Sequence, residues 1–177
     1  MTQIESKEID KITPEGLIES EEKFIKDLRD YLRVNKTKFK DYEIYILRNC
    51  SKSGQGFRLK WSQFFPDFIL WVKEVNNNTD QTIVFIEPHG LVHADINRDP
   101  KIKFASSGIK EIEQKLSGIG QKNIKLKCFL LSATKYEDLR FGKKEFPSQE
   151  EIENKKNVLF IDDPNWPEKL FKKIGVL

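Results

Sequence analysis

Two carboxylates, Asp67 and Glu87, each stand in an apolar stretch, and their spacing could bring them together. The stretches around them, 64–72 and 83–90, are rich in β-branched and aromatic residues, which is typical of strands. The polar segment 75–80 between them predicts a turn. If the two strands form an antiparallel hairpin about this turn, Asp67 and Glu87 lie opposite each other, with Cβ atoms about 4.5–5.5 Å apart.

Two acids at that separation favour a cation site. The carboxylates repel each other strongly unless a positive charge lies between them, and a hard divalent ion such as Mg²⁺ prefers oxygen ligands of this kind. His89 stands two positions after Glu87 and therefore projects from the same face of the strand. It could move a proton, bind a softer ion such as Mn²⁺, or be a hydrogen-bonded structural residue. Pro88 lacks an N–H and predicts a sheet edge or the end of strand pairing.

A third acid comes from a predicted helix that begins near Glu15. Its apolar residues recur at three- and four-residue steps and form one stripe; they are Leu17, Phe24, Ile25, Leu28, Tyr31 and Leu32. Glu21 falls inside this stripe, whereas Glu22 falls outside it, so one acid is directed toward the core. Alternatively, Glu21 is favoured only because acids near a helix start interact well with the helix dipole.

The remaining patterns complete a mixed α/β chain. Strands are predicted at 42–48, 57–61, 124–132 and 157–162, and helices at 101–116 and 164–174. The apolar second half of 124–132 indicates a central strand. The order of elements predicts a central mixed β-sheet flanked by helices. We expect a single domain over residues 1–177, with residues 1–14 as a flexible or short helical lead-in.

Composition excludes several classes of protein. The chain has 177 residues and a net charge of +3, so no bulk basic field indicates nucleic acid. The lysine clusters at 36–40 and 122–127 are either local basic patches or solvated faces. Cys50 and Cys128 form neither a disulfide framework nor a zinc spacing, which favours a cytoplasmic protein. No signal peptide or membrane span is predicted.

Five segments of the sequence carry a resemblance to a known family. In chain order they are 20–25, 44–49, 65–71, 86–91 and 129–134. Together they resemble the PD-(D/E)xK nucleases, the restriction-endonuclease-like superfamily. Within it they are similar to the C-terminal endonuclease domain of type III restriction and related DEAD/DEAH-box helicase-like defence proteins. The likeness spans residues 17–175, and the sequence lacks the phosphate loop of a helicase motor.

The resemblance implies a restriction-endonuclease-like core and a metal-dependent endonuclease that hydrolyses DNA in restriction or anti-phage defence. Asp67, Glu87 and the backbone carbonyl of Pro88 would hold Mg²⁺ or Mn²⁺, and Glu21 would complete the site directly or through water. In the family pattern a lysine stands at the position of His89, where it would orient water or stabilise the transition state.

The departure at His89 leaves other interpretations open. Lys101 and Lys103 are candidates for a displaced lysine and, with Arg58 and Lys60, for DNA contacts. The chain could instead be a catalytically impaired nuclease fold that binds DNA or serves as an assembly module, or a structural domain with buried acids. Cutting both DNA strands would suit a homodimer, and a helicase or translocase could act as partner or parent chain.

Overall fold

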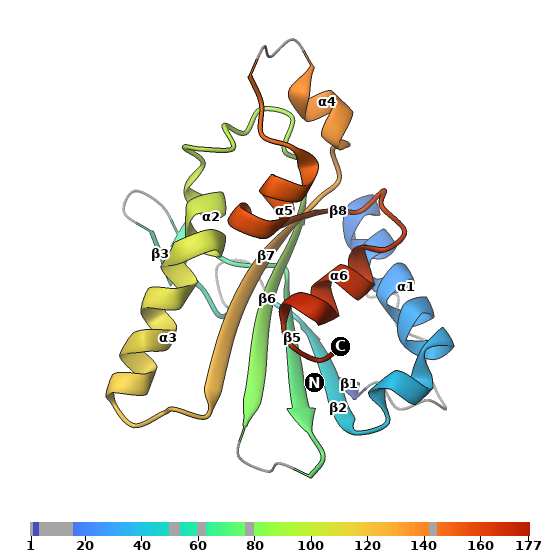
Figure 1. The fold of residues 1–177 in the computed structure, drawn as a ribbon, viewed down its shortest axis with the longest axis vertical. Helices are drawn as coiled ribbons and strands as arrows, with labels where there is room; N and C mark the ends of the chain where they lie inside the picture. The colour runs from blue at the N-terminus through green and yellow to red at the C-terminus, as the bar shows by residue number, and fades with distance from the viewer. Residues whose placement is uncertain (1, 4–15, 50–53, 60–62, 77–79, 142–144) are drawn as a thin grey trace.

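A six-stranded mixed sheet forms the centre of the computed structural model (Figure 1), which describes residues 2–3, 16–49, 54–59, 63–76, 80–141 and 145–177. In spatial order the described strands are β1 (Thr2–Gln3), β2 (Tyr42–Arg48), β5 (Phe68–Glu74), β6 (Gln81–His89), β7 (Ile124–Ser132) and β8 (Val158–Phe160). A separate ribbon pairs β3 (Phe57–Arg58) with β4 (Gln63–Phe64). The prediction of a mixed α/β chain with a central mixed sheet is confirmed.

The strand register supports the predicted pairing of the two acids. β5 and β6 are antiparallel, with Phe68 opposite Ile86, so the hairpin is confirmed. One further step in the same register places Asp67 opposite Glu87. β7 runs parallel to β6 on one side and to β8 on the other, so it is an interior strand, one position from the edge, and its apolar second half is paired on both sides. Pairing with β5 stops before Pro88, which remains aligned with β7.

Helices cover both faces of the sheet and bury two separate apolar clusters. One face packs against α1 (Glu19–Val34) and α6 (Trp166–Lys173). The other packs against α2 (Pro100–Lys103), the π-helical turn η2 (Phe104–Gly108), α3 (Ile109–Gly118) and α5 (Gln149–Lys156). The short helices η1 (Lys36–Phe39) and α4 (Tyr136–Arg140) complete the described elements, and α4 extends from the end of the sheet at the top of Figure 1.

The structure corrects the predicted helices in four places. The first helix begins at Glu19 and not near Glu15, so Leu17 precedes it. The helix predicted at 101–116 forms, but η2 interrupts it and brings the Phe104 ring over Gly108, where an added Cβ would lie 2.7 Å from that ring. The prediction missed α5, because this charged segment buries only Ile152 and Glu153 and so shows no apolar stripe. The closing helix begins at Trp166, two residues after its predicted start.

Parts of the predicted lead-in and loops fall outside the described residues. Thr2 and Gln3 pair with β2, whereas residues 4–14 of the lead-in, Lys60 and Cys50 lie outside the described part of the chain. Cys128 is a free, fully buried cysteine, and burial raises the pKa of its thiol well above the ordinary range. None of the described helices combines the length and the apolar character that a membrane crossing requires.

Candidate acidic site

Asp67 and Glu87 meet at the end of the sheet from which the 91–99 loop and α4 extend. Ile69 pairs with Phe85, and both belong to the apolar cluster under α2 and α3. Because side chains alternate along a strand, Asp67 and Glu87 project toward this same face. Glu87 is buried, with 5% of its surface exposed, while Asp67 is half-buried.

The neighbouring acids and burial strongly affect the protonation of Asp67. Burial, followed by repulsion from Glu87 and then from Glu21, raises the pKa of Asp67 from 3.8 to about 7. A hydrogen bond that protonated Asp67 donates to Glu87 acts in the same direction, whereas the positive charge of Lys101 lowers this pKa. The Glu87 Oε2 atom is buried, and no donor within the described residues bonds it. A proton or a cation between the carboxylates would relieve this arrangement.

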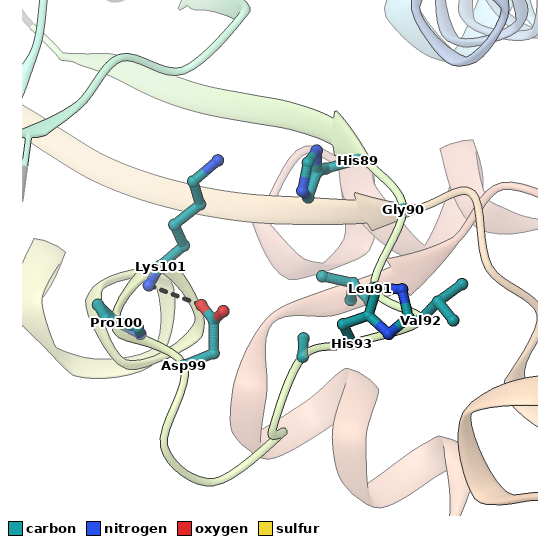
Figure 2. Close-up of a pocket in the computed structure, with 9 residues that line it drawn as sticks. His89, Gly90, Leu91, Val92, His93, Asp99, Pro100 and Lys101 are labelled. Carbon is teal, nitrogen blue, oxygen red and sulfur yellow. Dashed lines mark hydrogen bonds between the residues drawn. The ribbon is translucent and has the colours of Figure 1, made fainter.

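Lys101 brings a positive charge to the pair from a different element. Its Nζ atom lies 2.5 Å from Glu87 Oε1, and its ammonium lies 5.5 Å from the centre of the Phe64 ring. Asp99 caps the start of α2, because its Oδ1 atom accepts hydrogen bonds from the backbone N–H groups of Lys101 (2.8 Å) and Ile102 (3.1 Å). The cap fixes the first turn, so that the side chain of Lys101 extends toward β6 (Figure 2).

Glu21 approaches the site from α1, on the opposite face of the sheet. It is buried, as the helical stripe predicted, and its Oε2 atom accepts hydrogen bonds from the Ile18 backbone N–H (3.2 Å) and from Arg48 Nη2 (3.3 Å). At the same helix start, Ser20 Oγ donates to the Pro88 carbonyl over 3.5 Å. Glu21 therefore faces inward and also bonds the start of its helix, and its part in the site stays a prediction.

Asn49 positions Asp67 and was not recognised as a site residue from the sequence. Its buried side chain donates to the carbonyls of Gln55 (2.7 Å) and Pro66 (2.8 Å) and accepts from the Gln55 N–H (2.9 Å). Its own backbone N–H donates to the Asp67 carbonyl over 2.7 Å. These bonds tie the end of β2 to the Pro66–Asp67 segment. The only signal in the sequence is an Asn between a strand and a Gly-flanked loop, which favours a side-chain-bonded turn.

His89 lies at the mouth of the site, outside the acid pair. It is exposed, and among the described residues no hydrogen bond joins its side chain to Asp67 or Glu87. It borders a cavity of about 590 Å³ (Figure 2). The lining residues are His89, Gly90, Leu91, Val92, His93, Ala94, Asp99, Pro100 and Lys101. Of the predicted basic residues, Lys101 and not His89 contacts the acids.

The other predicted DNA contacts are exposed or lie outside the described residues. Arg58 is exposed on β3 and Lys103 is exposed on α2, while the position of Lys60 is not described. A further buried acid, Glu153, has full partners: Lys169 Nζ lies 2.7 and 2.8 Å from its two oxygens, and Gln149 donates to it over 2.9 Å. Because its charge is compensated, Glu153 is structural, in contrast to Glu87.

The oxygen atoms at the site could bind an ion with six ligands only if water or substrate supplied some of those ligands. In the described part of the chain, no group of three or more His, Cys, Asp or Glu side chains could hold a metal ion. Mg²⁺, however, is commonly held by one or two carboxylates, with water and substrate phosphates as further ligands. Asp67, Glu87 and the Pro88 carbonyl match that pattern, and the unbonded Glu87 Oε2 atom is the oxygen that such an ion would satisfy.

Fold and site together define a mixed α/β protein with a cluster of acids and one lysine at the end of its central sheet. Comparisons with protein-family models, with curated proteins and with solved structures gave no match for this chain. Its function is therefore inferred from the residues and their geometry.

Proposed function

We propose that this protein is a Mg²⁺- or Mn²⁺-dependent endonuclease that hydrolyses phosphodiester bonds in DNA on a restriction-endonuclease-like core. The observation that carries the proposal is the contact of 2.5 Å between Lys101 Nζ and Glu87 Oε1, beside Asp67. Two acids and a lysine are the combination that the resemblance implies. In this chain the lysine comes from α2 instead of from the strand position that His89 occupies.

Each group has a distinct role in the proposed hydrolysis. Asp67, Glu87 and the Pro88 carbonyl would hold the ion, which when bound supplies an acidified water and charge neutralisation at the phosphate. The ammonium of Lys101 stabilises the negative charge that develops on the phosphate oxygens. His89, at the mouth of the site, donates a hydrogen bond from an imidazole N–H to a neighbouring phosphate of the strand.

A role in restriction or anti-phage defence rests on the resemblance alone. The same holds for DNA as the partner and for assembly as a homodimer or with a helicase. The alternative is a nuclease fold that binds DNA without cutting it, and His89 at the lysine position favours it. Lys101 argues against this alternative, because it returns an ammonium group to the acids.

The test is cleavage of supercoiled plasmid with Mg²⁺, with Mn²⁺ and with a chelator. Wild-type protein is expected to nick or linearise the plasmid only with a divalent ion. Asp67→Asn and Glu87→Gln are each expected to lose about 10²-fold or more of the rate, whereas Glu111→Gln, an exposed acid on α3, keeps it. Wild-type rates in both site variants would overturn the proposal. DNA binding without cleavage under either ion would support the alternative.

A further inference from the structure

The cavity beside the acid pair extends beyond the groups that have hydrolytic roles. It has a volume of about 590 Å³ and lies between the end of β6, the segment 91–94 and the start of α2 (Figure 2). This volume falls within the range of about 300–1,000 Å³ that is typical of small-ligand sites. Both histidines of the chain, His89 and His93, line it. Lys101 also lines it and forms an ion pair with Glu87.

The loop that forms one wall of the cavity is held at both of its ends. At its start, the Leu91 N–H donates to Thr134 Oγ1 over 2.9 Å, in a buried bond to the segment after β7. At its end, the Asp99 N–H donates to the Asp95 carbonyl over 2.8 Å. Asp95 Oδ1 also accepts from the Arg98 N–H over 3.2 Å. The cavity is therefore preformed and does not need a ligand to order its wall.

The lining combines apolar surface with basic groups. Val92 keeps 65% of its surface exposed, although valine is apolar and the loop around it is fixed. Pro100 adds a second apolar surface, while His89, His93 and Lys101 supply hydrogen-bond donors. The one carboxylate in the lining, Asp99, is engaged by backbone N–H groups at the start of α2. Such a lining suits an anionic ligand with a flat, partly apolar body.

We infer that this cavity holds one nucleotide of the substrate strand, next to the phosphodiester bond that would be hydrolysed at the acid pair. The base lies against Val92 and Pro100, and the phosphate faces the two histidines and Lys101. Base contacts of this kind do not require a particular sequence, because every base has a π-face and an apolar surface. The inference rests on the proposed function, since the nucleotide belongs to the DNA strand that the site would cut.

The experiment measures binding of thymidine 5′-monophosphate by calorimetry without a divalent ion, with thymidine and inorganic phosphate as separate ligands. The monophosphate is expected to bind about tenfold or more tightly than either part, because both halves of the cavity contribute. His93→Ala is expected to weaken binding about fivefold, the loss of one hydrogen bond. Arg98→Ala is the matched control, because Arg98 is 87% exposed in the same loop and does not line the cavity.

Two results would overturn the inference: monophosphate binding no tighter than that of phosphate alone, or equal binding by wild type and His93→Ala. Val92→Asp provides a second variant, since its charge would repel the nucleotide without removing a histidine. The plasmid assay separates this inference from the proposed function. Cleavage without monophosphate binding would contradict only the inferred nucleotide site. Monophosphate binding without cleavage would contradict only the proposed nuclease activity.

Discussion

Lys101 Nζ lies 2.5 Å from Glu87 Oε1, although the two residues are 14 positions apart and belong to a helix and a strand. The ammonium engages one oxygen of Glu87, and its charge opposes the repulsion that raises the pKa of Asp67. Without a divalent ion, Lys101 therefore supplies the positive charge of the site. A metal ion that binds Asp67 and Glu87 must share Glu87 with this lysine or displace it.

Lys101→Met separates catalysis from metal binding. Methionine keeps an apolar stem beside Phe64 but removes the competing charge, so Mn²⁺ is expected to bind more tightly than to wild type, as measured by calorimetry. Plasmid cleavage is expected to fall about 10²-fold or more, because the charge that stabilises the transition state is lost. Lys103→Met, an exposed change on the same helix, should alter neither quantity. Weaker Mn²⁺ binding by Lys101→Met would contradict competition between the lysine and the metal.

Asp67→Asn is expected to stabilise the metal-free protein at pH 8. The pKa of Asp67 is 3.8 in an unfolded chain and about 7 in the folded one, so the folded state binds the extra proton between these values and wild-type stability falls as pH rises from 4 to 7. Above pH 7 the cost of ionising Asp67 is complete. Asparagine does not ionise, so the variant avoids this cost. Its free energy of unfolding is expected to be higher by about 1–2 kcal/mol, after allowance for solvent screening of a half-exposed group.

The measurement is urea denaturation of wild type and Asp67→Asn at pH 4 and pH 8. The two should be equally stable at pH 4, where Asp67 is protonated in nearly all molecules of the folded state, and should differ at pH 8. Mn²⁺ at pH 8 should stabilise wild type but not the variant. Asp162→Asn, at an exposed position after β8, is the control. A variant that is less stable than wild type at pH 8 would show that the Asp67 charge is favourable, against the argument above.

Asn49→Ala is expected to reduce both stability and metal binding. The substitution leaves the Gln55 N–H and the buried Pro66 carbonyl without their partner, which costs about 1–3 kcal/mol. Asp67 also loses the rigid segment before it, so Mn²⁺ affinity falls along with cleavage. Gln55→Ala tests the same loop without breaking these bonds, because only the backbone of Gln55 takes part. Normal Mn²⁺ affinity in a destabilised Asn49→Ala protein would limit Asn49 to a purely structural role.

The sequence predicts the acid pair because local patterns determine it. The apolar stretches on both sides of the turn fix the strands, and the turn fixes the register that aligns Phe68 with Ile86. Glu21 is likewise visible in the period of its helix. Strand β7 is recognised as an interior strand from its own apolar residues. In each case the residues that carry the signal lie within one or two neighbouring elements.

The position of Lys101 could not be predicted in the same way. Its helix crosses back over the sheet after the 91–99 loop, and the side chain reaches Glu87 only because the Asp99 cap fixes where α2 begins. That contact depends on packing between distant segments, which leaves no period in the sequence. Asn49 is missed for a similar reason, since its partner Pro66 lies 17 positions away.

Glu21→Gln tests whether the third acid serves the site or only its helix. Glutamine can still accept from the Ile18 N–H, and the pair with Arg48 is partly exposed, so stability is expected to change by about 1 kcal/mol or less. Repulsion on Asp67 decreases, which lowers the Asp67 pKa and moves the onset of Mn²⁺ binding to lower pH. Calorimetric titrations from pH 5.5 to 8 measure this shift. Glu22→Gln, the exposed neighbour, should not produce it, and an unchanged pH dependence in Glu21→Gln would confine Glu21 to the start of α1.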